Sequence, residues 1–363
     1  MTALPFVFSI GRALPPHYAD QASLLVALRK MWVQQHYNDA RVEQLHRAVK
    51  VSGRYLALPL AAYEQHDTLQ KNNDVFVRVA VELGEQACRE ALARAGLEPA
   101  DIDHIFFVTV TGIAVPGIDA RLVNRLGLRS DVKRTPIFGL GCVGGAAGIA
   151  RASDYLRAFP GEVALLLSTE LCSLTLQRGD VSVPNLIASG LFGDGAAAVV
   201  LGGPASKAAA AQTARAPATA PRVLATRSVF YPDTERVMGW DLVDSGFKIV
   251  LSPDVPQIVQ RHIGGDVDDF LRARGLGRAD LRHVIAHTGG PKVLRAFEKA
   301  LALPPEALRR SWDSLERTGN LSSASVLFVL RETLDAAEAR PGDLGLLLAV
   351  GPGFCSEMVL LQW

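Results

Sequence analysis

The chain has 363 residues, which is long for one small core and favours two halves within one compact body. Its 38 lysines and arginines nearly balance its 37 aspartates and glutamates, so the formal net charge is +1. A chain so close to neutral lacks the excess positive charge that favours binding to nucleic acids or anionic membranes. We therefore expect its partners to be small molecules.

The cysteines and the apolar runs exclude further classes of protein. Cys88, Cys142, Cys172 and Cys355 show no paired spacing and no nearby histidine, so the sequence predicts neither a disulfide framework nor a metal site. This cysteine usage is typical of the reducing cytoplasm, where we expect the protein to reside. No apolar run approaches the roughly 20 residues that a bilayer span needs, and no cleavable leader is visible, so we expect no membrane span.

Helical and strand patterns alternate along the first half. The residues before about position 75 mix polar and apolar types in a mainly helical pattern, and we expect them to form a cap or an entrance. The pattern then predicts, in chain order, a helix at 77–96, strands at 104–111 and 133–138, a helix at 144–158, and strands at 162–170 and 195–203.

An Ala-, Pro- and Thr-rich stretch at 204–221 has no periodic apolar face and is interpreted as a flexible connection between halves 1–203 and 222–363. The second half repeats the theme of the first. Its predicted elements are a strand at 281–288, helices at 291–302 and 320–337, and two closing strands within 344–363. The apolar strands and covering helices predict an α/β fold.

The stretch "IFGLGCVGGAAGIA" at 137–150 supports competing interpretations. Gly139, Gly141 and Gly144 spell G-x-G-x-x-G, which is typical of a dinucleotide-phosphate loop, and Glu170 follows the next strand at the distance of a ribose-binding carboxylate. The same loop places Cys142 on a strand-to-helix turn, where a helix N-terminus favours a thiolate. A buried structural cysteine is the third interpretation.

Two further polar residues make the nucleophile hypothesis testable. His287 ends an apolar strand and precedes two glycines and a proline, so its imidazole can project from the sheet edge. Asn320 stands at a helix start, where it could serve as an oxyanion donor or as an N-cap. His283 and His262 lack such a context and are assigned no role.

Four motifs together resemble those of a known family. "GCVGG" at 141–145, "HTGGP" at 287–291, "GNLSSASV" at 319–326 and "VGPGF" at 350–354 occur in the order found in type III polyketide synthases, the chalcone-synthase-like branch of the thiolase fold. The resemblance implies a layered α-β-α-β-α fold with two similar halves. It also implies a homodimer that uses acyl-CoA and malonyl-CoA as substrates and requires no cofactor.

The resemblance assigns the chemistry to three residues. Cys142, as a thiolate paired with protonated His287, would take an acyl group from an acyl-CoA. His287 and Asn320 would stabilise the enolate left when malonyl-CoA loses carbon dioxide. A carrier-protein-dependent 3-oxoacyl synthase III and a nicotinamide oxidoreductase stay as alternatives at this point.

The resemblance also predicts the substrate-binding residues. Phe192 matches one gatekeeper phenylalanine of the plant enzymes, whereas Ile249 replaces the second and Trp240 fills a position that is usually small. The loop with Val115 is expected to reach the cavity of a partner subunit. The complete predicted pocket is Val110, Thr111, Val115, Cys172, Thr175, Phe192, Trp240, Ile249 and Ser322. The predicted CoA-binding residues are Arg47, Lys50, Arg54, Gly289, Gly290 and Lys292.

The product is predicted from the character of the pocket walls. Apolar walls favour an aliphatic starter, because each buried methylene contributes about 0.8 kcal/mol, so an alkylpyrone or alkylresorcinol is the expected product. Trp240 argues for a shorter cavity, which keeps a triketide pyrone or a tetrahydroxynaphthalene-type product as the alternative.

Overall fold

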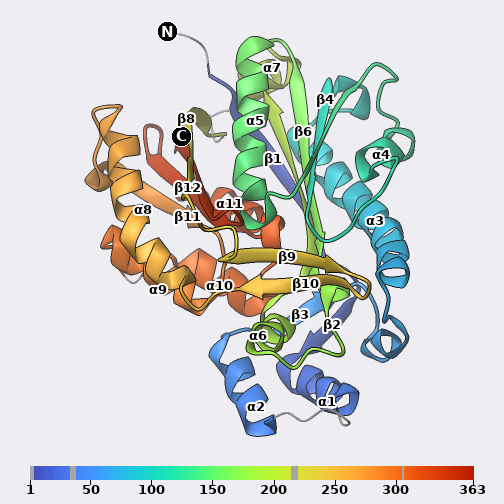
Figure 1. Ribbon diagram of the computed structural model, residues 1–363. Coiled ribbons are helices and arrows are strands. Elements are labelled where there is room, and N and C mark those ends of the chain that lie inside the picture. The colour runs from blue at the N-terminus through green and yellow to red at the C-terminus, as the bar shows by residue number, and fades with distance from the viewer. Residues whose placement is uncertain (1–3, 33–37, 214–219, 305) are drawn as a thin grey trace.

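The computed structural model describes residues 4–32, 38–213, 220–304 and 306–363. Most of its strands join one twisted sheet that runs through the molecule (Figure 1). Within the described residues this sheet has nine strands, in the order β11 (Leu281–Ala286), β12 (Leu344–Gly351), β13 (Cys355–Gln362), β8 (Arg222–Phe230), β1 (Phe6–Ala13), β7 (Asp194–Gly202), β6 (Val163–Leu171), β4 (His104–Thr109) and β5 (Lys133–Phe138).

The sheet consists of two similar halves. In the first half β4 runs parallel to β5 and β6, and β6, β7 and β1 are antiparallel neighbours. In the second half β11 runs parallel to β12, and β12, β13 and β8 are antiparallel neighbours. The two halves meet at β1 and β8, whose ladder pairs only Phe6 with Arg222.

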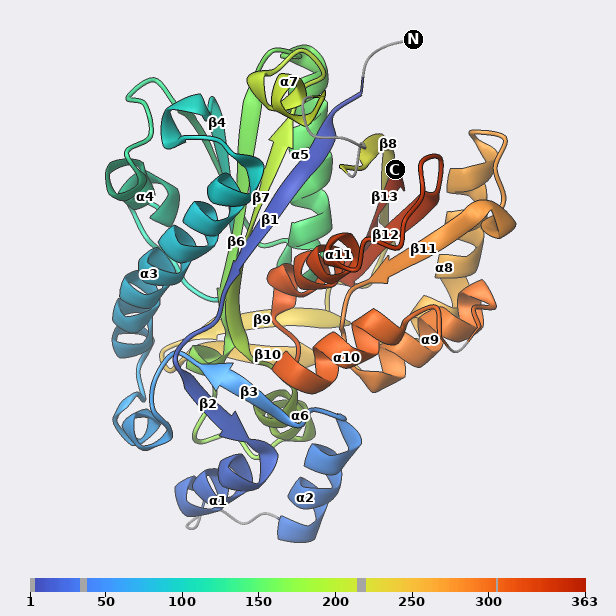
Figure 2. The ribbon, with the colours of Figure 1, turned by 180° about the vertical axis from the view of Figure 1, so that it is seen from behind.

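Helices cover both outer faces and fill the space between the halves. The outer helices are α3 (Leu69–Ala95) and α4 (Ile118–Leu126) on the first half, and α8 (Val255–Arg272) and α9 (Pro291–Leu301) on the second, as Figure 2 shows from behind. The central helices are α5 (Gly144–Ala158) and α11 (Ser325–Asp335). Separate hydrophobic clusters fill the spaces between the layers. The α-β-α-β-α fold with two similar halves is therefore confirmed.

Local sequence explains where the longest helix begins and ends. The side chain of Thr68 accepts a hydrogen bond from the backbone N–H of Lys71, which caps the first turn of α3. Gly96 ends the helix in the left-handed region, at a φ of 69°, where a side chain would be strained. Between these caps, apolar residues recur on the face that packs against β1, β6 and β7.

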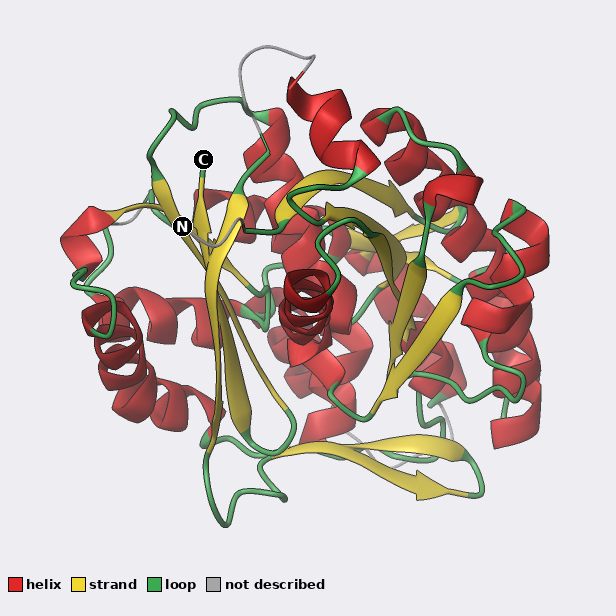
Figure 3. Ribbon diagram, turned by 90° about the horizontal axis from the view of Figure 1, so that it is seen from above, coloured by secondary structure: helices red, strands yellow, loops and turns green. Residues whose placement is uncertain are grey.

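Smaller elements form a base below the sheet in the view of Figure 1, and Figure 3 shows the molecule from above. A hairpin of β9 (Met238–Val243) and β10 (Gly246–Leu251) crosses under the central layer, and a two-stranded sheet joins β2 (His17–Asp20) to β3 (Gly53–Leu56). The surrounding helices are α1 (Gln21–Met31), α2 (Asp39–Ala48), α6 (Val183–Leu191) and α10 (Arg309–Thr318).

Two expectations about the fold need correction. The opening residues are not only a cap, because β1 lies inside the central sheet, where its alternate side chains are buried by α3 on one face and the central layer on the other. The stretch at 204–221 is not wholly irregular, since it contains the helix α7 (Lys207–Thr213). Residues 214–219 lie outside the described residues. No helix in the described part of the chain combines the length and apolar character that membrane crossing requires.

Candidate active site

Three segments that are far apart in sequence meet at the centre of the molecule. Cys142 lies in the 3-10 turn η3 (Gly141–Val143) that leads into α5, His287 directly follows β11, and Asn320 precedes the turn η6 (Ser322–Ala324) that leads into α11. All three side chains line one cavity of about 40 Å³. We call this the catalytic cavity. The sequence-based prediction of a Cys, His and Asn constellation is therefore consistent with the geometry.

The glycines around Cys142 are packing positions. A Cβ on Gly144 would lie 2.5 Å from Cγ1 of Val108, and one on Gly145 would lie 2.2 Å from the carbonyl oxygen of Ser323. Gly141 has a φ of 52°, and a Cβ there would lie 2.7 Å from the ring of Pro352. Packing around Cys142 therefore accounts for these three glycines without a bound pyrophosphate.

Glu170, the carboxylate that a dinucleotide would require, lies within the protein instead. Its Oε2 accepts hydrogen bonds from the hydroxyl of Thr111 at 2.8 Å and the backbone N–H of Val110 at 3.1 Å, and its Oε1 accepts one from Ser323. Burial raises the pKa of this carboxyl group to about 7. Glu170 thus ties β4, β6 and η6 together behind the catalytic cavity.

Replacing Gly145 with alanine should lower the free energy of unfolding by roughly 2 kcal/mol or more, because the new methyl group overlaps a backbone oxygen that cannot move freely. Gly265→Ala is the matched control, since Gly265 also lies within a helix but a methyl group added there would have no atom within 4 Å. It should gain up to about 1 kcal/mol. Urea unfolding of both variants measures the difference, and equal effects would contradict the packing explanation.

Cys142 is buried and has polar neighbours from η6. Its Sγ donates to the hydroxyl oxygen of Ser322 at 3.7 Å. Burial raises the pKa of the thiol to about 12, whereas hydrogen bonds with Ser322 and Asn320 act in the opposite direction. The N-terminus of α5 lies next to the sulfur and also favours a negative charge there.

His287 is 1% exposed, and its Nδ1 has no hydrogen-bond partner among the described residues. Burial lowers the pKa of its imidazole to about 3. Burial opposes the charge of a Cys142 thiolate and that of a His287 imidazolium, so the ion pair that the resemblance implies stays a prediction.

The side chain of Asn320 is held by the residues that follow it, and its role as an oxyanion donor stays a prediction. Its Oδ1 accepts hydrogen bonds from the backbone N–H of Ser322 at 2.8 Å and from the hydroxyl of Ser325 at 3.3 Å. Its backbone is fixed between Leu191 and Gly193, which flank Phe192 on the neighbouring segment. With Oδ1 occupied, the amide nitrogen is the group left to donate toward Cys142 and the cavity.

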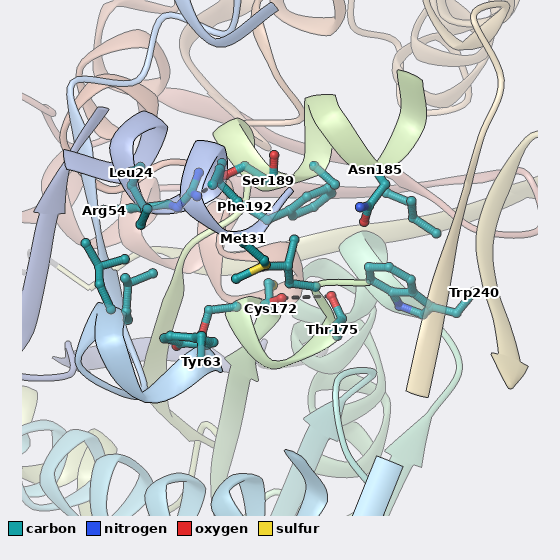
Figure 4. Close-up of a pocket in the computed structure, with 18 residues that line it drawn as sticks. Leu24, Met31, Arg54, Tyr63, Cys172, Thr175, Asn185, Ser189, Phe192 and Trp240 are labelled. Atoms are coloured by element: carbon teal, nitrogen blue, oxygen red, sulfur yellow. Dashed lines mark hydrogen bonds between the residues drawn. The ribbon is translucent and has the colours of Figure 1, made fainter. Parts of the chain in front are cut away.

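A second cavity, of about 50 Å³, adjoins the first, and we call it the inner chamber (Figure 4). Phe192, Trp240 and Ile249 line both spaces and form the constriction between them, with the Phe192 and Trp240 ring centroids 6.3 Å apart. Val110 and Ser322 line the catalytic cavity only, and Cys172 and Thr175 line the inner chamber only.

Two predicted pocket residues lie elsewhere. Thr111 is buried behind the cavity, where its hydroxyl donates to Glu170 and accepts from the backbone N–H of Leu171. Its neighbour Val110 lines the catalytic cavity, and successive residues of an extended chain point in opposite directions. Val115 is 93% exposed and lines neither cavity of its own chain, so its contact with a partner subunit stays a prediction.

The predicted CoA-binding residues comprise an exposed group, a pair of glycines and the buried Arg54. Arg47, Lys50 and Lys292 are exposed, and Arg47 pairs with Glu43. Gly289 lines the catalytic cavity, and Gly290 directly precedes α9 with a φ of 118°.

Arg54 departs from the prediction. It is 5% exposed and lines the inner chamber, so it cannot serve as a surface contact for CoA phosphates. The pairing of β3 with β2 turns this side chain inward, a feature that the basic spacing of the sequence did not indicate. Sequence reasoning also missed the chamber walls supplied by Leu24, Met31 and Tyr63, because no motif marks them.

Comparisons with known proteins agree with this site. The chain matches the model of the chalcone and stilbene synthase N-terminal domain over residues 2–205 and that of the C-terminal domain over residues 222–363. It is 47% identical over 357 residues to a 1,3,6,8-tetrahydroxynaphthalene synthase of Streptomyces peucetius, covering 98% of this chain and 93% of that protein. It is 34% identical to a putative chalcone synthase of Bacillus subtilis, covering 99% of each.

Solved structures show the same likeness. The crystal structure of 1,3,6,8-tetrahydroxynaphthalene synthase from Streptomyces coelicolor superposes with a TM-score of 0.91 at 31% identity, and each chain is 99% covered. The type III polyketide synthase domain of Steely1 from Dictyostelium gives a TM-score of 0.88 at 28% identity, with 99% of each chain covered. The chain therefore belongs to the chalcone and stilbene synthase family, and it is a type III polyketide synthase, an acyltransferase that condenses acyl units with decarboxylation.

Proposed function

We propose that this enzyme makes a product of the 1,3,6,8-tetrahydroxynaphthalene type from malonyl-CoA. The 47% identical relative, which carries that name, is the observation that most favours this product. Such a product consists of ring carbons and hydroxyl groups only, so two-carbon units account for its whole skeleton. The sequence-based expectation of an alkylpyrone or alkylresorcinol gives way to this alternative.

The shape of the site supports a compact product. The catalytic cavity has a volume of about 40 Å³ and the inner chamber one of about 50 Å³. Each is only a few times larger than the roughly 10–15 Å³ that one water molecule needs. Trp240 and Phe192, whose ring centroids lie 6.3 Å apart, line both spaces and limit their size.

In the proposed mechanism, Cys142 first takes up the starter. The sulfur attacks the thioester carbon of the acyl-CoA while the imidazole of His287 accepts the thiol proton. The bond between the acyl carbon and the CoA sulfur breaks, and CoA leaves as a thiol after taking that proton. The starter is then a thioester of Cys142.

Extension follows by decarboxylation of a malonyl-CoA. The bond to the carboxylate carbon breaks, carbon dioxide leaves, and the electron pair becomes the enolate of acetyl-CoA. Hydrogen-bond donors of His287 and Asn320 stabilise the enolate oxygen, which neutral donors can do in a site that excludes water. The enolate carbon attacks the Cys142 thioester and the Cys142 sulfur leaves, so the lengthened chain is a CoA thioester. Cys142 then attacks this thioester, CoA leaves, and the chain is again bound to the sulfur for another round.

Product analysis tests the proposal. Purified enzyme incubated with malonyl-CoA alone should form tetrahydroxynaphthalene, identified by mass and by comparison with an authentic standard. Addition of acyl-CoAs of increasing length should not displace this product. An enzyme that is inactive on malonyl-CoA alone but forms alkylpyrones from fatty acyl-CoA would overturn the proposal.

Trp240→Ala should shift product masses upward or admit longer acyl starters, because removal of the indole widens the constriction between the catalytic cavity and the inner chamber. Liquid chromatography with mass detection measures the distribution. Trp312→Ala is the matched control, since Trp312 lines neither space. An unchanged distribution in the Trp240 variant would show that the ring does not limit chain length.

The surface contacts are part of the same proposal. Arg47, Lys50 and Lys292 would meet the CoA phosphates, and the backbone of Gly289 and Gly290 would line the path of the pantetheine arm. Val115 would contact the partner in a homodimer, where its exposed side chain would be covered. A monomer measured by light scattering at micromolar concentration would contradict the dimer.

A further inference from the structure

The far end of the inner chamber holds a buried cation. Arg54 and Tyr63 lie on one side of the chamber, and Trp240, which also lines the catalytic cavity, lies on the other (Figure 4). The guanidinium donates one hydrogen bond through Nη2 to the carbonyl oxygen of Ser189. Its Nε and Nη1 are buried and have no hydrogen-bond partner in the described part of the chain. Unpartnered N–H groups of a buried charge are costly, which indicates that something else binds them during the reaction cycle.

The charged and titratable neighbours of Arg54 do not supply that partner. Asp194 attracts the guanidinium, but its carboxylate oxygens already accept from the backbone N–H groups of Ala57 at 2.6 Å and Ser173 at 2.7 Å, and from the Ser173 hydroxyl. Burial lowers the pKa of His46 to about 4, so this neighbour is neutral at pH 7.

The other two neighbours of Arg54 are neutral at pH 7 as well. Burial raises the pKa of the Tyr63 phenol and of the Cys172 thiol above their usual ranges. Burial also lowers the pKa of the guanidinium itself to about 10, which still leaves it protonated at pH 7. Arg54 therefore keeps its positive charge beside the Asp194 carboxylate, and its Nε and Nη1 are left to donate to a ligand in the chamber.

This cation lies where an acyl chain on Cys142 can extend. The inner chamber and the catalytic cavity share Phe192, Trp240 and Ile249. Cys172 lies close enough to both Cys142 and Arg54 to interact electrostatically with each. A chain that starts at the Cys142 sulfur and passes the constriction therefore points toward Arg54.

We propose that Arg54 is an anion-binding residue that takes the terminal carboxylate of an acyl group carried on Cys142. It thereby selects starters that end in a carboxylate over uncharged starters of the same length. A guanidinium donates charge-assisted hydrogen bonds to a carboxylate, and Nε and Nη1 of Arg54 have no other partner among the described residues. This inference rests on the proposed function, because it concerns the starter that Cys142 accepts.

The test compares pairs of thioesters that differ only at the far end. Succinyl-CoA against butyryl-CoA and glutaryl-CoA against valeryl-CoA present a carboxylate or a methyl group at matched length, and none of them loses carbon dioxide as malonyl-CoA does. The rate of Cys142 acylation is read by intact-protein mass spectrometry. We expect the wild type to prefer the carboxylate of at least one pair by roughly ten- to a hundredfold, the range for a charge-assisted hydrogen-bonded pair.

Arg54→Gln should remove this preference by slowing the carboxylated thioester while sparing the uncharged one. Arg54→Lys should keep part of this preference, because the charge stays but the ammonium group cannot place its N–H groups where those of the planar guanidinium lie. Arg331→Gln is the matched control, since Arg331 is also buried but is fully paired with Glu90 and Asp335. It should lower the melting temperature without changing the preference.

The outcomes separate this proposal from a structural role and from the proposed product. Equal acylation by both members of each pair in the wild type would overturn the role of Arg54, and this measurement needs no variant to fold. Equal slowing of both members in Arg54→Gln would also overturn it. A preference for the carboxylated thioesters in an enzyme that forms no tetrahydroxynaphthalene would support the role of Arg54 and refute the proposed product. Failure of Cys142 to accept any acyl group would refute the proposed function itself.

Discussion

Replacement of Cys142 by alanine is expected to abolish polyketide formation while malonyl-CoA decarboxylation persists. The variant has no sulfur to carry the growing chain, so no acyl-enzyme can form. The side chains of His287 and Asn320 still line the cavity, and they are the groups proposed to stabilise the enolate. The two activities are measured separately, as product by mass spectrometry and as carbon dioxide released from labelled malonyl-CoA.

Cys88→Ala provides the control for this experiment. Cys88 is fully buried in α3, away from both cavities, and burial raises its thiol pKa above the usual range. Its replacement should leave one acyl group per chain and normal product. Full polyketide output from Cys142→Ala, or loss of acylation in Cys88→Ala, would contradict the assignment of the nucleophile.

Asn320→Ala should reduce decarboxylation roughly a hundredfold or more, the usual effect of removing one preorganised donor. The same change also removes the acceptor for the buried N–H of Ser322, so we expect a loss of about 1–3 kcal/mol in the free energy of unfolding. Activity and stability therefore fall together in this variant, and a second substitution is needed to separate them.

Asn320→Asp makes that separation. Aspartate keeps an oxygen that can accept from Ser322 and Ser325, but it replaces the amide donor with a negative charge beside the enolate. We expect the melting temperature to stay close to that of the wild type while decarboxylation falls at least as far as in Asn320→Ala. Retention of decarboxylation by the aspartate variant would show that Asn320 is only a cap.

The sequence predicted those helices, strands and site residues that a local residue pattern marks. The strand at 133–138 and the helix at 144–158 match β5 and α5 at both ends. Glycines follow the strand and begin the helix, which marks the boundary between them. Cys142, His287 and Asn320 could be named because each stands in a motif of small residues. The motifs are also why the family resemblance was visible.

Residues whose role depends on distant pairing could not be placed in this way. Strand β1 lies far from its partner β7 in sequence, so its position depends on contacts that no local window contains. Arg54 stands among basic residues that suggested a surface cluster, and only the β2 and β3 pairing turns it inward. Thr111 is different, since the alternation of an extended chain would have placed it opposite Val110.

The limited ladder between β1 and β8 has a consequence for the ancestry of such a chain. Within the described part of the nine-stranded sheet, backbone pairing joins the halves at Phe6 and Arg222 only, whereas a cluster with members such as Val143, Ile149, Val326 and Leu330 fills the space between them. A chain with one half alone would expose that apolar face to water, and a rotated second copy of itself would be the simplest cover. The present molecule can thus be viewed as a symmetric pair made permanent by fusion, after which one copy kept the sulfur and the other kept the imidazole and the amide.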